Sequence, residues 1–150
     1  MWKILFILAL YFNTVVSGTA DGAEIERSEK MKIKLSFDDK TVIVRMEDNP
    51  AAAQILALLP ATFEFIDFAG EEKITDFPRP LSLNNAPRGM VASAGKMFIY
   101  APWGNMGFFY KNHGSTLDNS LIPLGEVESG LEHLVEQKGG FSAKIEILEK

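Results

Sequence analysis

The chain has 150 residues, of which 47% are hydrophobic and 23% charged, and its formal net charge is −5. This length predicts one domain, and the composition excludes a disordered polar chain. The absence of cysteine excludes a disulfide framework, a thiol nucleophile and lipid attachment through an N-terminal cysteine. Because the chain is acidic and has no basic cluster, we expect neither nucleic acid nor an anionic membrane surface as a partner.

The first twenty residues, MWKILFILALYFNTVVSGTA, have the pattern of a secretory signal peptide. Lys3 precedes a short apolar run, and the segment ends in the small residues Gly18 and Ala20. The apolar run stops at Asn13, well short of the roughly 20 residues that a transmembrane helix needs. We therefore expect cleavage after Ala20 and a periplasmic or secreted protein with no stable membrane anchor.

Three segments follow from this interpretation: a signal peptide at 1–20, a flexible polar arm at 21–30 and one domain at 31–150. Removing the signal peptide, with its Lys3, leaves 14 basic and 20 acidic residues, a net charge of −6. The mature domain has no disulfide, so its stability must depend on its hydrophobic core.

The first half of the domain begins with two alternating runs, MKIKLSF at 31–37 and TVIVRM at 41–46, which predict a hairpin across the turn DDK. Asn49-Pro50 then provides a cap and a first-turn proline for a helix that Pro60 ends. Its apolar residues fall at helical spacing and predict a plug for one end of a sheet or barrel: Ala52, Ile55, Leu56 and Leu59.

The next segment, TFEFIDFAGEEKI at 62–74, predicts a strand, a turn at Ala69-Gly70 and a second strand. Glu64 and Asp67 on the first of these strands should project to opposite faces. Glu71 to Lys73 are interpreted as a solvated turn. From 75 to 96 the pattern has three prolines and no sustained period, which predicts a long loop.

The second half predicts strands at 97–101, 107–111 and 121–127, with a polar turn region at 112–120. A short helix should follow, with Ser129 as its cap and Glu132 completing a capping box. Gly139 and Gly140 end it, before a last strand at 141–148. The fold class is therefore mainly β, with about eight strands and two short helices, and closure into a barrel would remove exposed strand edges.

Motifs for catalysis, metals and cofactors are largely absent. His113 and His133 are twenty residues apart, outside any metal-binding spacing, and no glycine-rich phosphate motif occurs, so we expect no metal and no cofactor. A Ser-His-Asp arrangement would have to combine Ser115 or Ser120 with His113 and Asp118, without a G-x-S-x-G elbow. The catalytic residues are therefore unknown.

The stretch YAPWGNMGFFY at 100–110 has two interpretations that do not exclude each other. It is a tight connection in which Trp103 covers a barrel end, or it lines a groove for a proline-containing peptide or small apolar ligand. Rigid aromatic side chains suit such a groove. Phe108 and Phe109 should face opposite sides of their strand, so both interpretations can hold.

The last third, GNMGFFY followed by LDNSLIPLGEVESGLEHLVE, resembles the cyclophilin pattern. The spacing of Gly125 and Gly130 and the pair Leu117-Asp118 match it. YAPWGN, the F-x-D-F-x-x-x-E-K-I segment at 65–74 and the G-E-V turn are similar to the bacterial cyclophilin-like domain family, whose members are small barrels. The resemblance spans about residues 31–150.

This resemblance implies a closed cyclophilin-like β-barrel and identifies Phe109 as a pocket residue. On the groove interpretation of the stretch at 100–110, Trp103 and Tyr100 line the same pocket. Thr116 stands where the cyclophilin pattern has tryptophan, and Leu121 where it has histidine. The segments that contribute the catalytic arginine are not found, and Arg79 or Arg88 of the long loop would have to replace it.

Three functions remain open on this evidence. The first is an exported module that binds a peptide or small ligand. The second is a peptidyl-prolyl cis-trans isomerase with a rearranged active site, so whether the protein is an enzyme is uncertain. The third is an interaction domain that docks a partner protein through loop 75–96.

Overall fold

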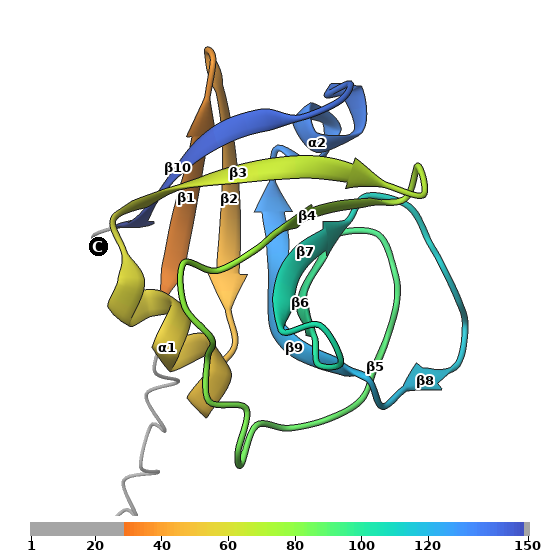
Figure 1. The fold of residues 1–150 in the computed structure, drawn as a ribbon. Helices are drawn as coiled ribbons and strands as arrows, with labels where there is room; N and C mark the ends of the chain where they lie inside the picture. The colour runs from red at the N-terminus through yellow and green to blue at the C-terminus, as the bar shows by residue number, and fades with distance from the viewer. Residues whose placement is uncertain (1–28, 149–150) are drawn as a thin grey trace, which may run out of the picture.

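Eight antiparallel strands form a closed barrel in the computed structural model, which describes residues 29–148 (Figure 1). The barrel order is β1-β10-β3-β4-β7-β6-β9-β2, and β5 and β8 form a separate two-stranded sheet. The expected signal peptide at 1–20 and most of the expected arm at 21–30 lie outside the described residues. The mainly β class, the barrel and the two short helices are thus confirmed.

The bounds of the elements follow the expected segments closely. They are β1 Lys32–Phe37, β2 Lys40–Met46, α1 Pro50–Leu58, β3 Ala61–Phe68, β4 Glu72–Thr75, β5 Met90–Val91, β6 Lys96–Tyr100, β7 Asn105–Phe109, β8 Leu117–Asp118, β9 Leu121–Ser129, α2 Leu131–Glu136 and β10 Phe141–Leu148. The two-residue strands β5 and β8 lie in segments that the sequence predicted as loop and turn. No helix among residues 29–148 is long and apolar enough to cross a membrane.

The barrel interior is filled by the alternate side chains of its strands. Along β1, every second residue is buried, and β2 and the first half of β3 repeat this period. Phe65 stacks on Phe141 of the neighbouring strand at 5.2 Å between ring centroids, and Phe108 packs at 6.0 Å from Phe65. These rings belong to a core that also includes buried residues of both helices.

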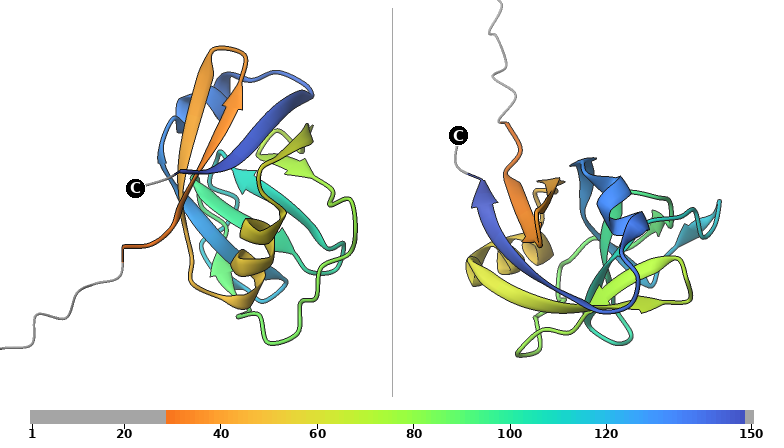
Figure 2. Two further views of the ribbon diagram at one scale, coloured as in Figure 1. Left: turned by 90° about the vertical axis from the view of Figure 1, so that its left-hand side faces the viewer. Right: turned by 90° about the horizontal axis from the view of Figure 1, so that it is seen from above.

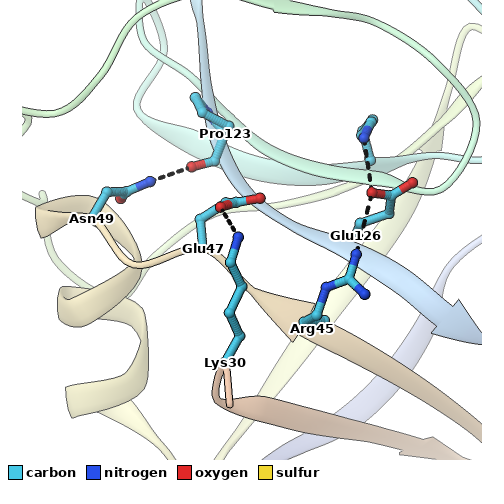
Figure 3. A network of polar contacts seen from close by, with 7 residues as sticks. Lys30, Arg45, Glu47, Asn49, Pro123 and Glu126 are labelled. Atoms are coloured by element: carbon cyan, nitrogen blue, oxygen red, sulfur yellow. Dashed lines mark hydrogen bonds and ion pairs between the residues drawn. The ribbon is translucent and has the colours of Figure 1, made fainter. Parts of the chain in front are cut away.

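Helix α1 is joined to the barrel wall through its cap. Asn49 Oδ1 accepts a hydrogen bond from the backbone N–H of Ala52 at 2.9 Å, which satisfies one of the free donors of the first turn. Its Nδ2 donates to the carbonyl oxygen of Pro123 on β9 at 2.8 Å (Figure 3). Ala51, Ala52 and Ile55 are fully buried against the core, so the predicted plug is confirmed.

A cluster of ion pairs lies next to this cap on the outer face of β2 and β9. Glu126 lies within 2.9 Å of Lys96 Nζ and 3.8 Å of Arg45, and Glu47 pairs with Lys30 (Figure 3). All of these side chains are largely solvated, and exposed pairs contribute about 0–1 kcal/mol each. They join neighbouring strands without adding much stability.

Helix α2 begins differently from the sequence prediction. Ser129 is not its cap, because it is the last residue of β9 and pairs with Ile43 of β2. The capping position is Gly130, whose φ is 88° and which has no side chain to cap with. A Cβ at this position would lie 2.3 Å from the carbonyl oxygen of Thr41, so only glycine fits there.

The segment between β4 and β5 runs along the outside of the barrel, as Figures 1 and 2 show. It is anchored by Gln54 of α1, whose amide donates to Ser82 O at 2.5 Å and accepts from Ser82 N at 2.9 Å. At its far end, Gly89 N donates to Leu121 O at 2.8 Å. The predicted long loop is therefore confirmed, except where β5 pairs with β8.

Candidate functional site

A pocket of about 300 Å³ lies on the outer face of the barrel wall formed by β4, β7 and β6. We call it the outer-wall pocket. Strands β4, β6 and β7, the turns after β3 and β6, and the segment around β8 line it. Its residues are Phe68, Ala69, Glu71, Glu72, Ile74, Phe98, Tyr100, Trp103, Asn105, Phe109, His113, Asp118, Ser120 and Leu121.

Strand alternation explains why this pocket is aromatic. All five residues of β7 are buried, but Phe108 belongs to the barrel core, whereas Phe109 belongs to a second cluster on the outside. The opposite orientations predicted for Phe108 and Phe109 are thereby confirmed. Strand β7 is buried on both faces because Met90, Ala92 and Leu121 belong to the same outer cluster as Phe109.

The floor of the pocket is a pair of stacked rings. Phe98 and Phe109 lie 4.2 Å apart between centroids with an interplanar angle of 22°. Phe98 is opposite Gly107 across the β6–β7 ladder, and a Cβ on Gly107 would lie 2.8 Å from Phe98 Cζ. The glycine therefore leaves the space in which the Phe98 ring lies across β7.

The rim of the pocket is formed by three further aromatic rings. Trp103 is 63% exposed and makes edge-to-face contacts with Tyr100 at 5.3 Å and Phe68 at 5.8 Å. The turn before β7 holds it in place, because Trp103 N and Gly104 N both donate to Tyr100 O. The stretch at 100–110 is thus both a tight connection and a pocket wall.

An acidic and basic pair lies at the Phe109 end. The imidazole of His113 stacks on Phe109 at 6.0 Å between centroids, and its Nδ1 contacts Glu71 Oε2. The hydrogen bond with Glu71 raises the pKa of His113 above its ordinary value. The charged imidazolium is therefore favoured at the mouth of the pocket.

The hydroxyl and N–H of Ser120 both donate to Asp118 Oδ1, and these bonds lower the pKa of the Asp118 carboxyl. Ser120, His113 and Asp118 do line one pocket. However, a nucleophilic triad needs the serine hydroxyl directed to the histidine, whereas here Ser120 donates to Asp118 and His113 contacts Glu71. The serine-hydrolase arrangement is not formed.

Two lining residues that the sequence analysis did not single out are polar and unpartnered. Asn105 is 5% exposed, and its Oδ1 is buried without a hydrogen-bond partner among the described residues. The Glu72 carboxylate, whose pKa is raised by desolvation, has no side-chain hydrogen bond or ion pair within residues 29–148, although the charge of His113 acts on it from nearby. The period-two alternation of β7 could have identified Asn105, because it places Asn105 on the same face of the strand as Gly107 and Phe109.

The interpretation of Glu71 to Lys73 as a solvated turn is wrong for Lys73. It lies in β4, is 1% exposed, and its Nζ donates to Asp67 Oδ1 at 2.8 Å and Gln137 O at 2.6 Å. The Tyr110 hydroxyl donates to the same Asp67 oxygen at 2.7 Å. The alternation of β4 required this burial, since Ile74 and Glu72 occupy the other face.

Arg79 and Arg88, predicted as pocket residues, are exposed on the loop between β4 and β5, and neither lines the outer-wall pocket. Among the described residues that line this pocket, only His113 has a basic side chain. The other three predicted residues, Phe109, Trp103 and Tyr100, all line the pocket. Within residues 29–148, no cluster of three His, Asp or Glu side chains is arranged to hold a metal ion.

The chain is similar to known proteins in sequence and in fold. The model of the Cyclophilin-like family matches residues 35–146. Among solved structures, the chain is similar to a hypothetical protein from Archaeoglobus fulgidus, with a TM-score of 0.63, 16% identity, and coverage of 82% of this chain and 98% of that one. At this identity the likeness concerns the fold alone. None of the curated proteins compared with the chain matches it.

Proposed function

Since the chain belongs to the Cyclophilin-like family, we propose that its outer-wall pocket binds an apolar ligand, a proline-containing peptide above all, without catalysing its isomerisation. The observation that carries this proposal is the stacked pair Phe98 and Phe109, which is itself buried and lines the pocket together with the exposed ring of Trp103. A rigid aromatic floor with polar groups at its edges is typical of sites for small or peptidic ligands.

The described residues that line the pocket include no arginine, which favours binding over catalysis. Isomerisation must weaken an amide whose rotation barrier is about 18–20 kcal/mol. The sequence predicted that Arg79 or Arg88 would replace the catalytic arginine, but neither residue lines the pocket. His113, the basic residue at the mouth, is already engaged by Glu71. A proline ring can therefore find an apolar floor here without a donor placed for catalysis.

The test is an NMR titration of the domain, beginning at Asp21, with the blocked peptide Ac-Ala-Pro-Phe-NH2. We expect shifts at Tyr100, Phe109 and His113, and a loss of roughly three- to tenfold in affinity for Trp103→Ala, because the ring contributes contact area. Val135→Ala is the control, since Val135 is 40% exposed on α2 and does not line the pocket. Shifts confined to other surfaces would contradict the proposal.

The same sample separates binding from catalysis. Uncatalysed X-Pro isomerisation takes tens to hundreds of seconds, so exchange spectroscopy would show cross-peaks between the cis and trans peptide only under catalysis. We expect none. Cross-peaks that weaken in Arg79→Ala or Arg88→Ala would favour the isomerase alternative instead.

A further inference from the structure

The side chain of Glu72 is a half-buried carboxylate with neither a hydrogen bond nor an ion pair among the described residues. It stands opposite Phe109 across the β4–β7 ladder and lines the outer-wall pocket. Burial raises the pKa of its carboxyl, and the nearby charge of His113 opposes this shift only in part. A desolvated carboxylate of this kind gains most from a positively charged partner.

The other charges around the pocket are also mainly acidic. Glu71 and Asp118 line the same pocket as Glu72, and His113 is the basic residue among the described lining residues. Contact with Glu71 engages the charge of His113. The pocket therefore has an excess of negative charge that an anionic ligand would meet unfavourably and a cationic ligand favourably.

Asn105 gives an independent indication of a ligand. It is 5% exposed, lines the pocket, and its Oδ1 has no partner among the described residues. Buried polar atoms in folded proteins are almost always hydrogen-bonded, so an unpartnered acceptor on a residue that lines a pocket favours a donor on the bound molecule. Asn105 is four residues from Phe109 on β7, which places the two ends of the pocket about 13 Å apart at roughly 3.3 Å per residue.

The walls between these two ends are aromatic. Phe98, Phe109, Tyr100, Trp103 and Phe68 all line the pocket. Aromatic faces attract an ammonium group as well as apolar carbon, and a nearby carboxylate strengthens this attraction. The acidic groups, the unpartnered acceptor and the aromatic walls together favour a ligand that has a positive charge, an N–H donor and an apolar body.

We propose that the outer-wall pocket selects ligands with an ammonium group on an apolar body, the ammonium lying at the Glu72 end and an N–H donor reaching Asn105. This inference rests on the proposed function, because it specifies the charge of the ligand for the same pocket. A short peptide with a free amino terminus next to proline meets all of these requirements, since its backbone N–H groups supply the donor.

The test compares two peptides that differ only in this charge, H-Ala-Pro-Phe-NH2 and Ac-Ala-Pro-Phe-NH2, by the fluorescence of Trp103 and by NMR at pH 7. In a chain beginning at Asp21, Trp103 is the only tryptophan. We expect the free amine to bind roughly tenfold more tightly, and Glu72→Gln to remove most of this preference. Glu64→Gln is the matched control, because Glu64 is an exposed β3 residue outside the pocket.

Each outcome decides between the two proposals. Equal affinity of both peptides for the pocket would overturn the selectivity for ammonium and leave the proposed function standing. A preference for the free amine that survives in Glu72→Gln would overturn the role of Glu72. If neither peptide shifts the pocket residues, both proposals fail together.

Discussion

His113 is the residue at which pH should act on the pocket. Its folded pKa is raised above the ordinary value of 6.5, mainly by the hydrogen bond with Glu71. The stabilisation from this contact is therefore fully present below pH 6.5 and is lost as the pH rises through the folded pKa. Because the imidazole stacks on Phe109, the loss should loosen one wall of the outer-wall pocket.

An NMR titration of the His113 ring protons checks this expectation. The midpoint should lie above 6.5 in the unaltered protein and fall in Glu71→Gln, which removes the charged acceptor. Glu132→Gln is the control, since Glu132 is close to His133 instead. Identical midpoints for His113 in the unaltered protein and Glu71→Gln would show that the contact with Glu71 does not control the proton.

Lys73 shows how a single residue can be misread without its neighbours. In the sequence it stands beside two glutamates, which suggests a solvated turn. In the structure it is enclosed by Asp67, Tyr110 and the carbonyl of Gln137, and its Nζ lies 4.7 Å from the Tyr110 ring centroid. Burial, and next the hydrogen bond to Asp67, raise the pKa of Tyr110 to about 12, so its hydroxyl stays protonated and donates.

At the scale of elements, the packing of β7 between its neighbours depends on Gly107. A Cβ there would lie 2.9 Å from the carbonyl oxygen of Lys73 on β4 and 2.8 Å from the Phe98 ring on β6. Gly107→Ala should therefore destabilise the protein by roughly 1–3 kcal/mol, because backbone atoms of β4 would have to move. Displacement of Phe98 should also weaken ligand binding at the pocket floor.

Urea unfolding measures this effect against a second glycine. Gly114→Ala is the matched control, because its Cβ would meet no atom within 4 Å, and we expect a change within about 0.5 kcal/mol. If Gly107→Ala and Gly114→Ala unfold at the same urea concentration, the close approach of β4, β6 and β7 is not what keeps this position glycine.

At the scale of the whole molecule, the first twenty residues predict where the mature chain begins. We propose that the protein is exported and cut after Ala20, on the basis of the charged, apolar and small-residue segments of 1–20. The intact mass of the protein purified from a secreting host should then correspond to residues 21–150. Replacing Ala20 by a bulky residue should block this cut. A mass that retains residues 1–20 would contradict the assignment.

The sequence by itself determined the eight barrel strands and the two helices, but not the short strands β5 and β8. Period-two runs, Asn49-Pro50 and the glycine and proline breaks are local signals, and local signals define strands, helices and turns. It also separated Phe108 from Phe109, because alternation depends only on the backbone of one strand. The resemblance to the cyclophilin pattern identified Phe109 as a pocket residue, and the aromatic stretch at 100–110 indicated Trp103 and Tyr100.

The tertiary structure alone decided which side chains meet across strands. The pairing of β4 with β7 buries Lys73 and places Glu72 opposite Phe109. The close approach of Gly130 to Thr41 makes Gly130, and not Ser129, the capping position of α2. The loop between β4 and β5 left Arg79 and Arg88 outside the pocket. These outcomes depend on register and on contacts between residues distant in the chain, which no local pattern encodes.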